Sequence, residues 1–184
     1  MRARVVLTRY KPGPEGDRDG LGGRVVTPSG LTLYSHELPY RDVDGDGNSD
    51  KNRSCVPPGV YLCEYLLSPA HKKKVYHLTK VLMPDGSWGP LPGGRTVIEI
   101  HVGNLTGDVE LGALTPVLGC VVLGNSLGVF PAGQAFKCAD GQVRKLPKPQ
   151  HGVLGSVDAL ERFEADLGGE TFELQIVQGE VVLQ

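Results

Sequence analysis

The chain has 184 residues and a formal net charge of -2 at pH 7, with 40% hydrophobic and 22% charged residues. These values are typical of a soluble globular domain and argue against a protein that binds nucleic acid through a strongly basic surface. No window approaches the roughly eighteen apolar residues of a membrane span, and the first apolar run is too short for a signal peptide. We therefore expect one domain over residues 1–184 that is soluble and cytoplasmic when synthesised.

Short strands joined by turns are predicted for most of the chain, because it contains 26 glycines and 14 prolines. The expected strands cover residues 3–8, 23–27, 31–38, 60–66 and 75–82. The second and third of these form a hairpin around Pro28-Ser29-Gly30. The segment 83–94 is rich in glycine and proline around Trp88, so we expect it to be irregular, with the indole packed on the sheet or in contact with substrate.

One helix is predicted near the C-terminus, capped by Ser156 and ended by Gly168-Gly169. Its apolar positions recur at helical spacing and indicate a face that docks on the sheet: Val157, Leu160, Phe163 and Leu167. Strands over 171–177 and 180–183 then form a terminal hairpin around Gln178-Gly179. The predicted fold class is mostly β, a compact antiparallel sandwich or barrel-like sheet with one C-terminal α-helix before a terminal hairpin.

The four cysteines lie at positions 55, 63, 120 and 138 and form no CxxC pair. This density is too low for a disulfide scaffold, so reduced thiols are the expected state. A bridge between Cys55 and Cys63 is the less favoured alternative, and it requires an oxidising compartment.

An acidic loop, inserted at residues 41–53, matches the first nine positions of a calcium-binding loop. Its candidate calcium ligands are Asp42, Asp44, Asp46, Asn48 (through its backbone carbonyl) and Asp50. Four carboxylates so close together repel unless a cation compensates them. Position 12 is Arg53 instead of a bidentate glutamate, so we expect a weak, structural calcium site. The alternative is a solvated turn, because Asp and Gly also favour turns.

One imidazole and one thiol stand on two expected strands. Alternation in VIEIHV places Ile98 and Ile100 on the core face and Glu99 and His101 on the opposite face. Cys120 follows Gly119 and opens the apolar run VVL. If the two strands are neighbours, a base lies beside a nucleophile.

Cys-His pairing is sufficient for nucleophilic catalysis, because histidine can take the proton of the thiol and leave a thiolate. The candidate catalytic residues are Cys120 as nucleophile, His101 as base, and Glu99 or Asn104 as the group that orients the imidazole. Backbone N–H groups near Gly119 and Cys120 are candidates for an oxyanion hole. The alternative is purely structural, since cysteine is often buried and a lone histidine on a strand is often scaffold.

Several motifs resemble a domain-of-unknown-function family of phage and bacterial proteins. They are ELPYRD, SCVPPGVY, PGGRTVIEIHVGN, GCVVLG and SVDALERF, and the resemblance spans about Gly22 to Ile176. Against that pattern the acidic loop is an insertion, and the stretch 105–118 is longer than usual. The histidine and the later Gly-Cys are also distantly similar to YkuD-type L,D-transpeptidases, mostly β enzymes whose cysteine attacks a peptidoglycan stem peptide.

The second resemblance implies a cysteine-dependent stem-peptide transferase or hydrolase with Cys120 as nucleophile and His101 as base. Two positions depart from its pattern: Leu118 stands where the family has a polar residue, and Val122 replaces the arginine that positions an anionic substrate. The alternative function is a non-catalytic structural or assembly protein, such as a phage tail or baseplate component. The expected partners are accordingly cell-wall peptide or virion assembly proteins, and the protein is expected to be virion-associated or released in the second case.

Overall fold

The computed structural model describes the backbone of residues 2–11, 18–43, 45, 49–138 and 141–182, and their side chains up to residue 180. The strands are β1 (Ala3–Lys11), β2 (Leu21–Val26), β3 (Thr32–Glu37), β4 (Gly59–Ser68), β5 (Lys73–Leu82), β6 (Trp88–Gly89), β7 (Ile98–His101), β8 (Val121–Gly124), β9 (Ser126–Phe130), β10 (Ala135–Lys137), β11 (Val143–Lys145), β12 (Gln150–Leu154) and β13 (Phe172–Val182). The helices are α1 (Ser156–Leu167) and the short 3-10 turns η1 (Pro92–Gly94) and η2 (Val109–Leu111).

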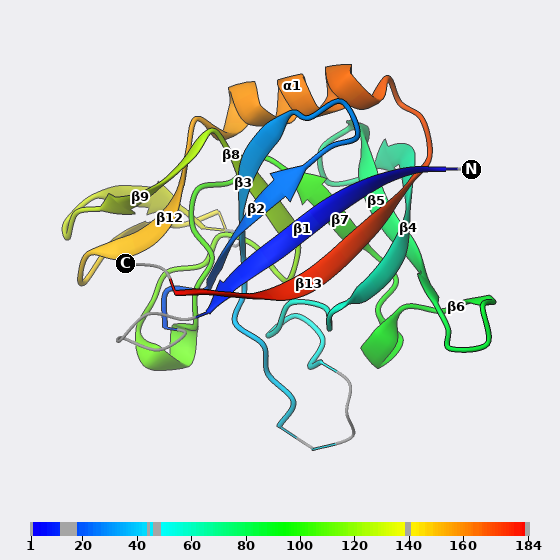
Figure 1. Ribbon diagram of the computed structural model, residues 1–184. Helices are drawn as coiled ribbons and strands as arrows, with labels where there is room; N and C mark the ends of the chain where they lie inside the picture. The colour runs from blue at the N-terminus through cyan, green and yellow to red at the C-terminus, as the bar shows by residue number, and fades with distance from the viewer. Residues whose placement is uncertain (1, 12–17, 44, 46–48, 139–140, 183–184) are drawn as a thin grey trace.

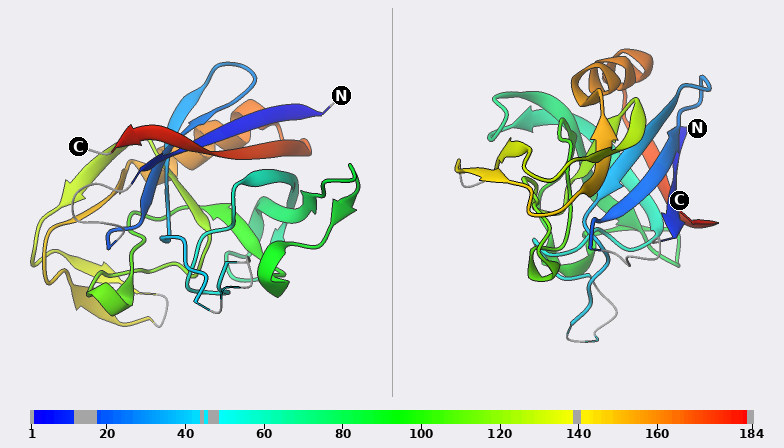
Figure 2. Two further views of the ribbon diagram at one scale, coloured as in Figure 1. Left: turned by 60° about the horizontal axis from the view of Figure 1, so that its bottom comes forward. Right: turned by 90° about the vertical axis from the view of Figure 1, so that its left-hand side faces the viewer.

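The main sheet closes on itself as a barrel. Its strand order is β4-β13-β1-β2-β3-β8-β7-β5, and β5 pairs again with β4 (Figure 1). The pairs β1–β13 and β7–β8 are parallel, whereas the other pairs around the barrel are antiparallel. The hairpins β9–β12 and β10–β11 form separate two-stranded sheets beside it (Figure 2). The mostly β prediction is confirmed, and the sheet is a barrel instead of a sandwich.

Strand alternation fills the barrel with apolar side chains, as predicted for β7. Ile98 and Ile100 are buried in the main core together with Val121 and Leu123 of β8. At one end of the barrel α1 lies across the strands (Figure 1). There the Phe163 ring lies 5.7 Å from Tyr76 and 5.8 Å from Phe172, centroid to centroid. The helix therefore closes this end of the core with aromatic contacts.

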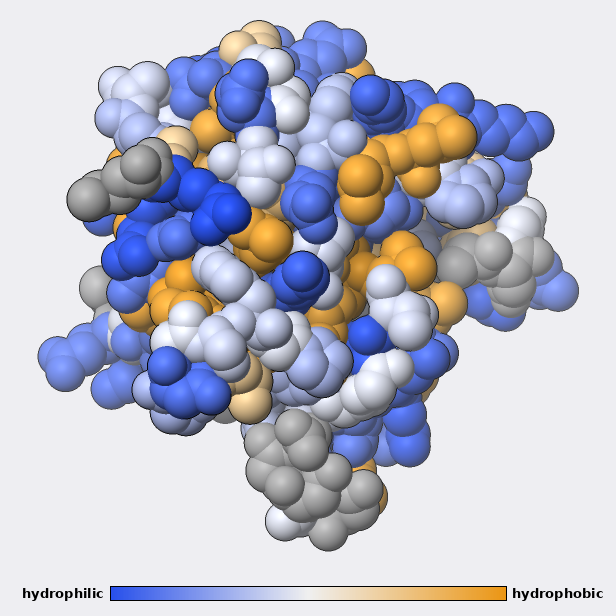
Figure 3. Space-filling view, turned by 90° about the vertical axis from the view of Figure 1, so that its right-hand side faces the viewer, coloured by the Kyte–Doolittle hydropathy of each residue, from blue (hydrophilic) through white to orange (hydrophobic). Residues whose placement is uncertain are grey.

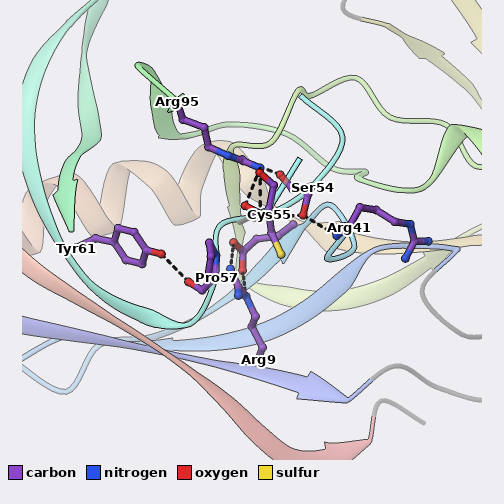
Figure 4. Close-up of polar contacts among 9 residues, drawn as sticks. Arg9, Arg41, Ser54, Cys55, Pro57, Tyr61 and Arg95 are labelled. Atoms are coloured by element: carbon purple, nitrogen blue, oxygen red, sulfur yellow. Dashed lines mark hydrogen bonds and ion pairs between the residues drawn. The ribbon is translucent and has the colours of Figure 1, made fainter. Parts of the chain in front are cut away.

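The opposite end of the barrel has a polar interior, shown in Figure 4. Arg9 follows the inward-facing Val5 and Leu7 on β1, and its Nε and Nη2 donate to the Glu37 carboxylate at 2.8 and 2.7 Å. Both side chains are at most 2% exposed. Nearby, the Tyr61 hydroxyl donates to the Pro57 carbonyl at 2.7 Å. A buried, bidentate ion pair therefore joins β1 to β3 where the core stops being apolar.

The helix α1 is confirmed, but its cap and its buried face differ from the prediction. Gly155 is the N-cap, with a φ of 66°. Ser156 instead accepts a hydrogen bond at its Oγ from the Gly103 N–H, at 2.9 Å. Val157 is 62% exposed, and Ala159 takes its place on the buried face. Tertiary contacts with the 102–104 segment, which the helical repeat does not encode, decide how the helix begins.

The predicted terminal hairpin is wrong. Residues 172–182 form a single strand, β13, which pairs in parallel with β1 and passes an irregularity opposite Arg9 to Lys11. Gly179 does not turn the chain. A Cβ at this position would lie 2.7 Å from the Arg9 carbonyl oxygen. The glycine therefore allows two backbones to approach each other closely. In the sequence, such a glycine cannot be distinguished from a glycine in a turn.

The segment 83–94 was predicted to be irregular, but it contains the short strand β6 and the turn η1. Trp88 pairs with Leu82 and Gly89 with Val81, which extends the sheet beyond β5. The Arg2 guanidinium lies 6.0 Å from the Trp88 ring centroid, so the indole lies near the residue that precedes β1.

Among the described residues, no helix has both the length and the apolar character that crossing a bilayer demands.

Removal of one partner of the buried ion pair is expected to destabilise the barrel strongly. Arg9→Met leaves Glu37 buried without its cation and should lower the free energy of unfolding in urea by about 3–5 kcal/mol. The double variant Arg9→Met/Glu37→Leu should recover most of this loss. Arg4→Met is the control, because Arg4 pairs with Glu173 at the surface and should cost less than about 1 kcal/mol. An Arg9→Met loss no larger than the control's would contradict this account.

Acid is expected to destabilise the fold through His36, which is 0% exposed and whose Nδ1 lies 2.6 Å from Thr106 Oγ1. Burial lowers the pKa of His36 to about 4 from 6.5, so the unfolded chain binds the extra proton between these two values. The contribution of neutral His36 to the free energy of unfolding is complete above pH 6.5. It is lost as the pH falls toward 4, by about 3 kcal/mol in total. Unfolding curves at pH 7 and 4 should show a smaller acid loss for His36→Gln than for wild type. Equal losses would refute the assignment.

Candidate functional site

The candidate site lies on the outer face of β5, β7 and β8. Strands β7 and β8 pair in parallel through Ile100↔Val121, which confirms the prediction that they are neighbours. One residue earlier, Glu99 of β7 lies beside Cys120, the residue that precedes β8, and a backbone hydrogen bond of Glu99 reaches that cysteine. Antiparallel pairing of β5 with β7 sets His77 opposite Glu99. Because paired residues share a face of the sheet, His77, Glu99 and Cys120 form a row across three strands.

Glu99 is the buried anion of this row, with 4% of its surface exposed. Its Oε1 lies 3.5 Å from His77 Nε2, and its Oε2 lies 3.3 Å from His71 Nε2. His71 comes from the turn between β4 and β5, and its ring centroid is 4.8 Å from that of His101. The carboxylate oxygens therefore face His71 and His77, and Glu99 acts on His101 through charge: it raises the pKa of that imidazole.

The His101 imidazole is neutral and has one unprotonated nitrogen, as a general base requires. Its Nδ1 lies 2.6 Å from the Val102 carbonyl oxygen. A carbonyl only accepts hydrogen bonds, so Nδ1 carries the proton and Nε2 has a free lone pair. Burial lowers the pKa of His101, and the nearby His71 acts in the same direction. The neutral imidazole is therefore the form present at neutral pH.

Cys120 has a protonated thiol at rest. The side chain is partly exposed, as a nucleophile that meets a substrate must be. Burial raises its pKa above the ordinary value, and the Glu99 carboxylate raises it further. A backbone hydrogen bond with Glu99 and the charge of Arg95 act in the opposite direction. A base is therefore needed before this sulfur can attack.

The two candidate catalytic side chains are offset along their strands. His101 pairs with Val122, two residues beyond Cys120. Adjacent strands and a two-residue step separate their Cβ atoms by about 8 Å. Proton transfer across this offset requires that the side chains lean toward each other or share one water.

Asn104 points to a different part of the fold. The side-chain Nδ2 of Asn104 donates to the Val153 carbonyl at 3.0 Å, and the backbone carbonyl of Asn104 accepts from the Val153 N–H at 2.9 Å. These bonds fasten β12, and with it the β9–β12 hairpin, to the end of β7. The contacts of Asn104 are therefore structural, and its proposed role in orienting the imidazole stays a prediction.

Arg95 fixes the loop that approaches Cys120 (Figure 4). This side chain is 6% exposed; its Nη1 donates to the Ser54 carbonyl at 2.8 Å, and its Nη2 donates to the Asp50 carbonyl at 2.6 Å. Gly119 has a φ of 90°, and a Cβ there would lie 3.0 Å from the Ser54 oxygen. The missing side chain at Gly119 therefore allows the 49–55 loop to approach the residue before Cys120.

The acidic loop is described only in part. Asp44, Asp46 and Asn48 lie outside the described residues, whereas Asp42 and Asp50 lie within them. The Asp50 carboxylate accepts from the Val43 N–H at 3.3 Å. Within the described ranges, no group of three or more His, Cys, Asp or Glu side chains is arranged to hold a metal ion. The calcium site therefore stays a prediction.

The inserted loop is attached to the long connection that precedes β8. Arg41 pairs with Asp108 at 2.5 Å, and Arg53 pairs with Glu110. Ion pairs therefore join the segments 41–53 and 105–118.

Sequence reasoning missed three residues of the site: His71, His77 and Arg95. Alternation with the buried Tyr76 and Leu78 was a signal for His77, since it places this imidazole on the outer face. His71 begins the run HKKK, a pattern typical of a solvated basic surface, but only the three lysines of the run are exposed. Nothing in the local pattern indicated that Arg95 would bind loop carbonyls.

All four cysteines are free, as expected, and three of them, Cys55, Cys63 and Cys138, are buried. Burial raises the pKa of Cys55 to about 11 and that of Cys63 well above its usual value. Cys120 is therefore the thiol that reagents in solution reach first.

Comparisons with family models, curated proteins and solved structures returned no match for this chain. The relationship to the family of phage and bacterial proteins and to the L,D-transpeptidases therefore remains a prediction from the motifs.

Glu99→Gln is expected to make Cys120 more reactive, because the Glu99 carboxylate opposes the thiolate. Alkylation by iodoacetamide at pH 8, followed on the Cys120 peptide by mass spectrometry, should accelerate roughly two- to threefold. Glu161→Gln on the exposed side of α1 is the matched control and should leave the rate unchanged. A slower reaction in Glu99→Gln would show instead that the carboxylate assists the thiol, as the orienting member of a triad does.

Proposed function

We propose that this protein is a cysteine-dependent acyl-transfer enzyme that acts on cell-wall stem peptide, as a transferase or as a hydrolase. The observation that carries the proposal is the juxtaposition on β7 and β8. A partly exposed thiol, Cys120, shares the outer face of two paired strands with His101, an imidazole whose Nε2 is unprotonated. The motif resemblance supplies the substrate class.

In the first step, the Cys120 sulfur attacks the carbonyl carbon of an amide while His101 Nε2 accepts the thiol proton. The negative charge moves to the carbonyl oxygen, and the backbone N–H groups beside Gly119 and Cys120 are the proposed donors to it. Collapse of this intermediate breaks the C–N bond. The imidazolium returns its proton to the departing amine, which leaves a thioester on Cys120.

In the second step, His101 accepts a proton from the incoming nucleophile, which attacks the thioester carbonyl. An amine gives a new amide and completes a transfer, whereas water gives a free carboxylic acid and completes a hydrolysis. The carbon–sulfur bond breaks, and the proton returns to sulfur. Glu99 stabilises the imidazolium in both steps, because its charge raises the pKa of His101.

The surface beside these strands supports a small polar substrate better than a broad apolar interface. On the side that carries β4, β5 and β6, Figure 3 shows apolar groups separated by hydrophilic ones. The exposed apolar side chains of β4 and β5 include Leu66, Leu67 and Leu82. Val122, at the family's arginine position, is fully buried, so the recognition of an anionic substrate falls to other residues.

Incubation with purified muropeptides tests the proposal. Wild type should convert a tetrapeptide or pentapeptide substrate, and intact-mass spectrometry should find a covalent acyl adduct on Cys120. Cys120→Ser should lose turnover by about a thousandfold or more, since the nucleophile is gone. His101→Gln should lose about a hundred- to ten-thousandfold, the usual contribution of a general base.

Cys138→Ser is the matched control, because this cysteine is buried in the β10–β11 hairpin, away from the site, and its loss should leave turnover intact. If wild type shows neither turnover nor an adduct, the enzymatic proposal fails. A fixed copy number in a larger particle would then support the structural or assembly role.

A further inference from the structure

A small pocket lies at the common start of β7 and β8. Its volume is about 180 Å³. The lining residues come from the inserted loop, from the segment that enters β7 and from the residue before Gly119: Lys51, Asn52, Arg95, Thr96, Val97, Ile98 and Leu118. Leu118 is two residues before Cys120, and Ile98 is one residue before Glu99. Arg95 brings the pocket close to Cys120, because its Nη1 would lie 3.2 Å from a Cβ placed on Gly119, the residue before the cysteine.

Two cations line this pocket. Lys51 is exposed, whereas the Arg95 side chain is buried. The two terminal nitrogens of Arg95 are occupied by loop carbonyls, but its Nε is buried and has no hydrogen-bond partner among the described residues. The buried guanidinium therefore contributes to the pocket through its charge, and the exposed Lys51 adds a second positive charge.

Two described carboxylates near the pocket are directed elsewhere: Glu99 faces His71 and His77, and the Asp50 carboxylate accepts from the Val43 N–H. The charged side chains that line the pocket are therefore both cationic. Thr96 and Asn52 add a hydroxyl and an amide that can donate hydrogen bonds. The volume accommodates a carboxylate on a short aliphatic stem.

We propose that this pocket is an anion subsite that holds a carboxylate of the acyl donor next to the carbonyl attacked by Cys120. This assignment of substrate chemistry rests on the proposed function. Lys51 and Asn52 belong to the 41–53 insertion, so the inserted loop gives this chain a specificity pocket of its own. The cations at this place also supply the anion recognition that the buried Val122 cannot provide.

Two alkylating reagents that differ mainly in charge test the subsite without any substrate. Iodoacetate is an anion and iodoacetamide is neutral, and both alkylate the same sulfur. The ratio of their rates at Cys120, measured by mass spectrometry of its peptide, should exceed the ratio for free 2-mercaptoethanol. Added salt should reduce this preference, because the charge of Lys51 is exposed to solvent and is therefore screened by ions.

Lys51→Gln should lower the iodoacetate-to-iodoacetamide ratio by about two- to fivefold, the range of an exposed ion pair. This side chain is exposed, so its loss leaves the fold intact, whereas Arg95 holds the 49–55 loop and is a poor choice for substitution. Lys148→Gln removes the same charge from the loop between β11 and β12 and should leave the ratio unchanged.

A wild-type ratio no higher than that of 2-mercaptoethanol, or an unchanged ratio in Lys51→Gln, would overturn the subsite. The result is separable from the proposed enzymatic function, because alkylation needs no turnover. A preference for iodoacetate without muropeptide turnover keeps the subsite and rejects the enzyme. Muropeptide turnover with no such preference keeps the enzyme and rejects the subsite.

Discussion

The parallel pairing of β7 with β8 is the constraint on which the rest of the site depends. Its register, Ile100↔Val121, buries those two residues in the barrel and leaves Glu99, His101 and Cys120 on the outer face. Parallel neighbours need a crossover connection, and the long stretch 105–118 is part of it. A shift of one residue on either strand would send its polar side chains into the core, so the apolar contacts inside the barrel fix the chemistry outside it.

The polar end of the barrel, opposite α1, carries the loop that approaches this outer face. The Arg9–Glu37 ion pair stands inside, and Arg95 binds the carbonyls of the 49–55 loop just above it (Figure 4). That loop passes within van der Waals distance of Gly119 and contributes one wall of the pocket beside Cys120. The position of this loop and the surroundings of the thiol are therefore linked physically through Arg95 and Gly119.

Residue alternation was enough to predict the site strands and which of their side chains leave the core, because each face of a strand has a period of two. Sequence was less informative where a residue serves tertiary contact. Gly179 permits close backbone approach to Arg9 instead of a turn. Ser156 binds Gly103 instead of capping α1. His71 enters the site from a turn whose lysine-rich pattern indicates only solvent, since long-range contacts leave no local periodic signal.

The central claim is that His101 Nε2 is the unprotonated base that serves Cys120, and nitrogen NMR of the histidine ring tests it most directly. With ¹⁵N-labelled histidine at pH 7, this account predicts a protonated Nδ1 and an unprotonated Nε2 for His101. It further predicts that the Nε2 resonance moves when Cys120 is replaced by serine. A protonated Nε2, or ring nitrogen resonances that do not change when Cys120 is replaced by serine, would contradict the claim.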